Sequence, residues 1–148
     1  MKSILLLTLA LLTLAHGNSQ QPADTPTDEL DKLQGTWIFV SLEVEGAKLP
    51  EAMLNGSKII IKGDNFKSIS AGITYEGKLK IDVSKTPKTL DLIFTDGPEK
   101  GRTSLGIFER AGDNLKICLS LAGSTRPTEF ASKQGSGFAF ETLKREKQ

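Results

Sequence analysis

Residues 73–83 read ITYEGKLKIDV, a stretch in which apolar and polar side chains alternate. The odd-numbered positions carry Ile, Tyr, Gly, Leu, Ile and Val, whereas the even-numbered positions carry Thr, Glu, Lys, Lys and Asp. Successive side chains of a β-strand point to opposite faces, so the pattern predicts a strand with one buried and one solvated face. The alternation recurs in residues 90–94 and 115–121, which indicates an antiparallel all-β domain.

Turn-forming residues interrupt the chain after Gly35 about every ten residues. The breaks are Asn55-Gly56, Gly63-Asp64, Ala71-Gly72, Thr86-Pro87, Asp96-Gly97-Pro98 and Gly112-Asp113-Asn114. Between them we expect strands at residues 36–45, 57–62, 65–70, 73–83, 89–95, 102–110, 115–121 and 138–145. Eight consecutive strands favour an antiparallel up-and-down barrel, because closure removes the two exposed edges. A two-sheet sandwich is the alternative.

Two short helices are expected beside the strands. Thr25 can cap the first helix, Asp28 completes a capping box, and Gly35 ends it. The second helix lies within residues 49–54 and begins at Pro50. We expect it to form a lid over one barrel mouth, between strands one and two.

The N-terminal residues predict export. Residues 1–17 contain an apolar run that follows one lysine and ends in small residues, as secretory signal peptides do. Residues 18–25 are polar and predict a flexible leader, and residues 26–148 form one barrel domain. We therefore expect a periplasmic or extracellular protein without a transmembrane segment after signal cleavage.

The residue inventory excludes several classes of function. The chain carries 19 Lys and Arg against 18 Asp and Glu, a balance that disfavours nucleic-acid binding. Its one histidine, His16, would leave with the signal peptide, so neither a Ser-His-Asp triad nor a histidine-ligated metal is available. Its one cysteine, Cys118, cannot form an internal disulfide. We predict no catalytic residue, no cofactor and no metal site.

Residues 33–37 read LQGTW at the entry to the first strand. This stretch resembles the Gly-x-Trp fingerprint of the lipocalins and the wider calycin superfamily. The resemblance implies that Trp37 plugs the closed end of the barrel, with a basic residue of the last strand lying across its ring. Arg145 is the candidate and Lys144 the alternative. Gly35, Trp37 and Arg145 are therefore expected to be structural rather than ligand-binding.

Further stretches extend the resemblance over nearly the whole chain after Leu33. Residues 61–64 read IKGD, residues 105–108 read LGIF, and residues 126–133 read RPTEFASK, followed by GSG at 135–137. Together with LQGTW they are similar to a secreted domain family of planctomycete bacteria that is regarded as lipocalin-like. The resemblance implies a barrel and an exported protein, but it brings no assigned biochemical activity.

The barrel interior is the first candidate site. Eight strands enclose space that is either filled by side chains or wide enough for one small ligand. The inward positions are mostly Ile, Leu and Phe, which favours a filled core. Met53 and Leu54 of the lid helix would suit a small apolar guest, or would simply seal the core. We expect four inward polar side chains, namely Ser68, Ser70, Tyr75 and Thr142.

The segment that precedes the last strand is the second candidate. Arg126, held by a following proline, could present its guanidinium to a carboxylate or phosphate, with Glu129 nearby. The favoured alternative is that Arg126 and Glu129 pair with each other or with main chain and pin this segment, while Phe130 anchors it. Cys118 occupies an outward position and is either a reactive thiol or a small filler.

Three classes of function follow in order of preference. The first is a noncatalytic module that binds a small hydrophobic ligand in the barrel. The second is a protein-interaction or protease-inhibitor-like module, because similar secreted bacterial barrels inhibit proteases through an N-terminal arm such as residues 18–27. Those inhibitors carry a disulfide that one cysteine cannot supply. An enzyme comes third.

Overall fold

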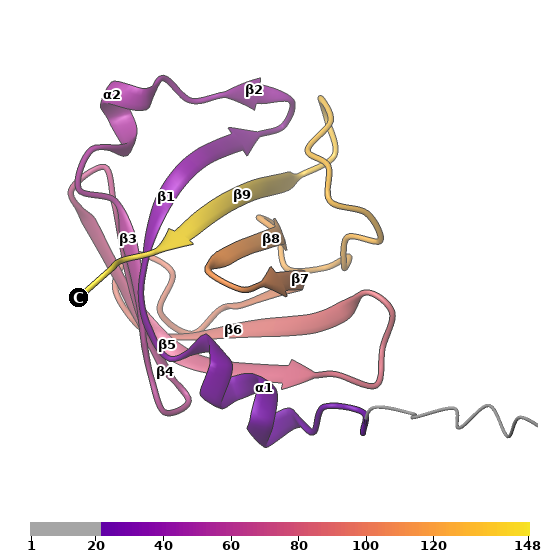
Figure 1. The fold of residues 1–148 in the computed structure, drawn as a ribbon. Coiled ribbons are helices and arrows are strands. Elements are labelled where there is room, and N and C mark those ends of the chain that lie inside the picture. Colours follow the sequence, from indigo (N-terminus) through magenta and orange to yellow (C-terminus); the bar gives the residue numbers. More distant parts are fainter. Residues whose placement is uncertain (1–21) are drawn as a thin grey trace, which may run out of the picture.

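The structure, a computed structural model, describes residues 22–148. One antiparallel sheet closes into a barrel, with α1 (Pro26–Leu33) under one end and α2 (Glu51–Leu54) at the other (Figure 1). The strands are β1 (Gly35–Val44), β2 (Ala47–Lys48), β3 (Lys58–Lys62), β4 (Asn65–Ser70), β5 (Ile73–Asp82), β6 (Lys88–Asp96), β7 (Thr103–Ala111), β8 (Asn114–Ser120) and β9 (Phe138–Arg145). The predicted signal peptide, residues 1–17, lies outside the described residues. Within residues 22–148, neither helix is long and apolar enough to cross a membrane.

The barrel closes because its last strand pairs with its first. The order around it is β1-β3-β4-β5-β6-β7-β8-β9, and β9 returns to β1 with Arg145 opposite Trp37. All these pairs are antiparallel. The predicted eight-stranded up-and-down barrel is confirmed, and the sandwich alternative is excluded. The two-residue strand β2, which pairs with the end of β1, was not predicted.

Helix α1 forms the closed end of the barrel, and its own sequence sets its start. Thr25 Oγ1 accepts a hydrogen bond from the Asp28 main-chain N–H at 3.2 Å, and Asp28 Oδ2 accepts one from the Thr25 N–H at 3.2 Å. This reciprocal pair is the capping box expected from the sequence. Leu33, at the other end of the helix, is buried in the hydrophobic core. The helix thus presents one apolar stripe to the barrel.

Trp37 fills the barrel just above this helix and is fully buried. Its Nε1 donates to the main-chain carbonyl of Leu33 at 2.8 Å. The guanidinium carbon of Arg145 lies 4.2 Å from the ring centroid, and Arg145 Nη2 donates to the carbonyl of Lys32 at 2.6 Å. A Cβ on Gly35 would come within 3.3 Å of Arg145 Nη1, and φ there is +112°. The glycine therefore permits the close approach of the arginine.

A buried ionic cluster completes the closed end. Glu29 of α1 is 1% exposed. Its Oε1 lies 3.2 Å from Arg110 Nε of β7, and its Oε2 lies 3.1 Å from Lys88 Nζ of β6. Each carboxylate oxygen therefore has its own cation, and the cluster ties the helix to two strands.

The opposite end is built from loops. It comprises the β1–β2 hairpin, α2 and the crossover segment, defined as residues 121–137 between β8 and β9 (Figure 1). Ser132 Oγ accepts a hydrogen bond from the Gly46 N–H at 3.0 Å and donates to the carbonyl of Phe138 at 2.9 Å. These two bonds hold the hairpin against the crossover segment.

A candidate ligand-binding cavity

A cavity of about 300 Å³ occupies the barrel interior at the end opposite α1. Toward α1 the interior is filled by the buried side chains of Trp37, Leu115 and Leu143. More than half of the cavity-lining residues are apolar or aromatic. They are Phe39, Leu42, Val44, Ile59, Phe66, Ser68, Ser70, Tyr75, Leu92, Phe94, Glu99, Arg102, Thr103, Ser104, Leu119, Leu121, Ala139 and Glu141. The barrel is thus packed at one end and hollow at the other.

Aromatic rings form part of the cavity wall. Phe66 and Phe94 meet edge to face, with ring centroids 5.6 Å apart. Tyr75 meets Phe94 in a similar way at 6.2 Å. Phe39 lines the cavity from β1. Rings in mutual edge contact hold one another in place, so this wall offers a firm apolar surface.

Three of the four polar side chains expected inside the barrel line the cavity, and the fourth does not. Ser68, Ser70 and Tyr75 belong to the lining. The expectation for Thr142 was wrong, because its Oγ1 lies 2.5 Å from Ser41 Oγ on the outer face. The reason is that the outer face of β9 is also apolar. It carries aromatic side chains that the crossover segment covers, including Phe140, whose ring packs 6.3 Å from that of Phe130.

Glu141, one position before Thr142, is the inward side chain that the sequence reasoning missed. It is 8% exposed, and its Oε2 is buried without a hydrogen-bond partner among the described residues. Its cross-strand neighbours on β1 and β8 are Leu42 and Ile117, which offer no polar group. Burial in these surroundings raises the pKa of Glu141 to about 8. The signal that could have found it is alternation with Ala139 and Leu143, two small or aliphatic inward residues.

The rim of the cavity carries a second carboxylate, which is engaged. Glu99, in the turn between β6 and β7, has Oε2 2.5 Å from Arg102 Nη1. Arg102 Nη2 also donates to the carbonyl of Leu121 at 2.9 Å. The two rim charges therefore pair with each other and with main chain rather than with Glu141.

The lid residues do not line the cavity. Met53 is 50% exposed, and Leu54 is buried in the hydrophobic core. Neither is among the residues around the cavity. Of the candidate ligand-binding residues proposed from the sequence, the structure brings only Tyr75 to the cavity.

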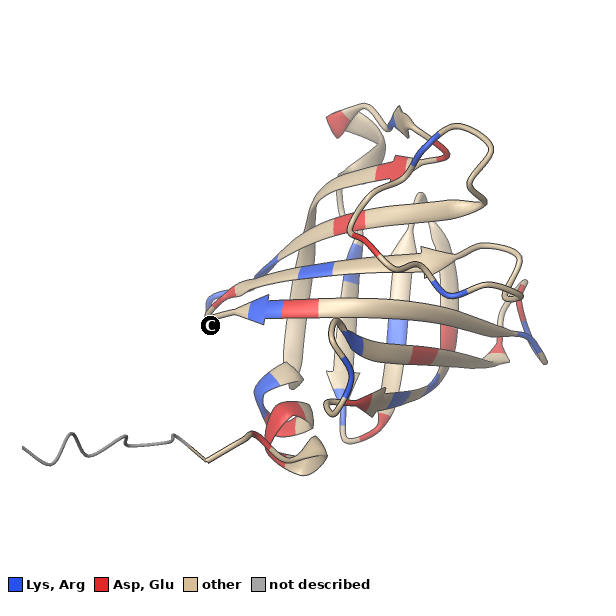
Figure 2. Cartoon of the chain, turned by 90° about the vertical axis from the view of Figure 1, so that its right-hand side faces the viewer, with Lys and Arg blue, Asp and Glu red and all other residues tan. Residues whose placement is uncertain are grey.

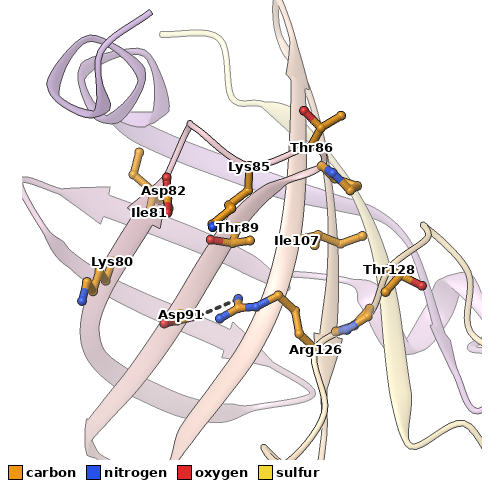
Figure 3. A pocket seen from close by; sticks show the side chains of 12 residues that line it. Lys80, Ile81, Asp82, Lys85, Thr86, Thr89, Asp91, Ile107, Arg126 and Thr128 are labelled. Atoms are coloured by element: carbon orange, nitrogen blue, oxygen red, sulfur yellow. Dashed lines mark ion pairs between the residues drawn. The ribbon is translucent and has the colours of Figure 1, made fainter.

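Arg126 lies outside the barrel, in a hollow of about 490 Å³ between β5, β6, β7 and the crossover segment (Figure 3). Its Nη1 is 2.7 Å from Asp91 Oδ1 and also donates to the carbonyl of Gly106 at 2.7 Å. Figure 3 shows the guanidinium directed at Asp91. Glu129 pairs instead with Lys133 at 2.8 Å. Arg126 and Glu129 are therefore not brought together, and the guanidinium is held by main chain and one carboxylate.

Cys118 is fully buried under the crossover segment. Its Sγ lies 3.4 Å from the carbonyl oxygen of Ala131. Burial raises the pKa of the thiol, which lowers the thiolate fraction on which reactivity depends. These surroundings match those of a small filling side chain.

Basic and acidic residues are interspersed along the strands in the view of Figure 2. Within residues 22–148, no group of three or more His, Cys, Asp or Glu side chains is arranged to hold a metal ion. Comparison of the chain with models of protein families, with curated proteins and with solved structures gave no match.

Proposed function

We propose that this protein is an exported, noncatalytic, lipocalin-like module that holds one small, mostly apolar ligand in the open end of its barrel. The observation that carries the proposal is the cavity of about 300 Å³ with its aromatic wall. Small-molecule sites are usually concave and apolar with a few placed polar groups, and this volume lies at the lower end of their range. The ligand would therefore be small.

The scaffold around the cavity supports a binding role. Its lining side chains stand mainly on paired strands, and strands position a site more accurately than loops do. The packed closed end holds those strands together independently of any ligand. Because the closed end stabilises the barrel, the open half can contain a cavity. In a barrel with only a structural role we would expect side chains to fill that space.

Export and membership in the planctomycete lipocalin-like family belong to the same proposal, and they are supported by the sequence features of residues 1–17 and 33–137. The alternative, a protein-interaction module, depends on an arm at residues 18–27. Residues 18–21 of that arm lie outside the described part of the chain. That alternative stays a prediction from the sequence.

A fluorescent apolar probe tests the proposal. N-phenyl-1-naphthylamine titrated into the purified protein should show a saturable rise in fluorescence with one site per chain. Ser68→Phe places a ring inside the cavity and should weaken binding at least tenfold. Lys67→Phe adds the same ring at the adjacent exposed position of β4 and should leave binding unchanged.

Melting temperatures of both variants establish that each is folded. Fatty acids, retinoids and small aromatic compounds are then tested by displacement of the probe. Absence of saturable binding throughout this panel would contradict the proposal, as would equal weakening by the inner and the outer phenylalanine.

A further inference from the structure

Glu141 is the feature of the cavity that an apolar ligand alone does not explain. Its carboxyl group lies inside the barrel, and among the described residues nothing hydrogen-bonds its Oε2. A buried polar group without a partner costs free energy, and a charged one costs much more. A leucine at this position would fill the space without that cost.

We propose that the ligand of the cavity carries a protonated amine, and that Glu141 binds this ammonium group while the aromatic wall holds the apolar body. The inference rests on the proposed function and names the chemical class of ligand for the same site. Glu141 would then have its partner only in the complex.

The aromatic wall supports a cation in particular. The π-faces of Phe, Tyr and Trp attract ammonium groups, and this attraction strengthens when the cation is removed from water. The cavity presents Phe39, Phe66, Tyr75 and Phe94 in the same enclosed space as the carboxyl group of Glu141. An apolar ammonium compound could therefore contact the carboxyl group through its charge and the aromatic rings through its apolar body.

An anionic ligand is disfavoured by the same geometry. A carboxylate cannot form an ion pair with Glu141 in either protonation state, and it would lose its own hydration inside the cavity. The cation at the rim, Arg102, already contacts Glu99 and the carbonyl of Leu121. No further cation is among the side chains that line the cavity.

The protonation state of Glu141 provides a second measurable consequence of the inference. Because burial raises the pKa of Glu141 to about 8, its carboxyl holds a proton at pH 7 in the free protein. Binding of an ammonium group favours the ionised carboxylate and therefore releases that proton.

Other titratable or charged residues lie around Glu141. Those of the cavity lining are Tyr75, Glu99 and Arg102. Those at outward positions of the flanking strands β1 and β8 are Glu43, Lys116 and Cys118.

The test compares ligands that share one body and differ in one group. 2-Phenylethylamine, 2-phenylethanol, 3-phenylpropanoate and 4-phenylbutan-2-one are titrated into the protein by calorimetry at pH 7. We expect the amine to bind at least tenfold more tightly than the alcohol. Repeating the amine titration in buffers of different ionisation enthalpy should reveal proton release on binding.

Two variants locate the effect. Glu141→Gln should abolish the preference for the amine and the proton release while it keeps binding of the alcohol. Glu43→Gln is the matched control, because it removes a carboxylate at an outward position of the neighbouring strand β1, outside the cavity lining, and it should keep the preference.

The outcomes separate this inference from the proposed function. If the alcohol binds but the amine has no advantage, or if Glu141→Gln keeps that advantage, the inference is wrong and the cavity remains a binding site. Tightest binding of the ketone would also overturn it, because a neutral Glu141 would then donate to a carbonyl. If none of the four compounds gives saturable binding, both proposals fail for ligands of this size.

Discussion

Two glutamates lie buried at opposite ends of the described barrel, and they differ in what surrounds them. Glu29 at the closed end is 1% exposed, and both of its oxygens face cations, Lys88 and Arg110. Glu141 at the open end is 8% exposed, and its Oε2 has no partner among residues 22–148. A buried carboxylate is tolerated when it is paired and is costly when it is not. The closed end therefore pairs its buried glutamate with two cations, whereas the open end leaves an oxygen of its buried glutamate without a partner.

The contrast extends from the two side chains to the two halves of the barrel. The closed half joins Trp37, Arg145 and α1 through main-chain hydrogen bonds and a stacked guanidinium. The open half keeps a cavity of about 300 Å³. Binding sites commonly lower the stability of a protein, because side chains positioned to contact a ligand lack favourable contacts in the unliganded fold. Substitutions at the two ends should therefore shift stability in opposite directions.

The largest loss of stability is expected at the closed end. Glu29→Ala removes the carboxylate between Lys88 and Arg110 and leaves two cations without their partner. We expect the free energy of unfolding to fall by about 3 kcal/mol, as when one member of a buried pair is deleted. Urea denaturation followed by tryptophan fluorescence measures it, because Trp37 is the one tryptophan of the chain.

The control for this variant is Glu109→Ala on the outer surface. Glu109 is exposed and lies 3.7 Å from Lys116. Exposed pairs of this kind contribute about 0.5 kcal/mol. Equal losses in the two variants would show that the buried cluster does not hold α1 to the barrel.

A change in the opposite direction is expected at the open end, and it depends on pH. In the unfolded chain Glu141 ionises near an ordinary glutamate pKa of about 4.3. In the folded chain its pKa is about 8. Between these values the folded state keeps a proton that the unfolded state has lost, so this residue lowers the free energy of unfolding as pH rises. Above the folded pKa the loss is complete.

Glu141→Gln removes that titration. We expect the variant to be more stable than the parent by about 5 kcal/mol at pH 9, because the folded and unfolded pKa values differ by about 3.7 units of about 1.36 kcal/mol each, and the difference should shrink toward zero near pH 4. Urea denaturation of the variant and the parent at several pH values measures the difference. A constant difference between the Glu141 variant and the parent from pH 4 to pH 9 would contradict a buried, unpartnered carboxyl group.

A smaller effect is expected where the last strand meets the helix. Arg145→Ala removes the guanidinium over Trp37 and the hydrogen bond to the Lys32 carbonyl. We expect a loss of about 2 kcal/mol, from the cation–π contact and the lost hydrogen bonds together. The cavity at the far end should be unaffected, so probe binding should persist below the lowered melting temperature. Loss of binding in a folded Arg145→Ala protein would show that the two halves are coupled.

The strands of this barrel were predictable because most of them repeat one local pattern, in which inward apolar side chains alternate with outward polar ones. Alternation in residues 73–83 predicted β5 to within one residue of its observed end at Asp82, and the turn residues predicted the bounds of β4. β2 escaped prediction because two residues are too few to show alternation, and its pairing with β1 depends on the surrounding hairpin.

The site was less predictable, for reasons that also lie in the pattern. On β9 both faces carry apolar side chains, so alternation alone did not tell which face is inward and Thr142 was assigned in place of Glu141. The partner of Arg126 was likewise not predicted, because Asp91 is remote in sequence and approaches Arg126 only in the folded protein, on the outer side of β6. Local periodicity predicts strands, whereas contacts between distant segments decide which polar groups are satisfied.

The smallest effect separates the outer hollow from the inner cavity. Arg126→Ala removes a guanidinium that contacts Asp91 and the carbonyl of Gly106, and both partners of the ion pair are partly solvated. We therefore expect a loss of only about 1 kcal/mol, the usual contribution of a hydrogen-bonded and partly exposed pair. Lys133→Ala, which breaks the fully exposed pair with Glu129, should change the melting temperature even less. Because the barrel wall stands between Arg126 and the cavity, neither variant should alter probe binding. An altered affinity in Arg126→Ala would mean that the outer hollow and the inner cavity are coupled.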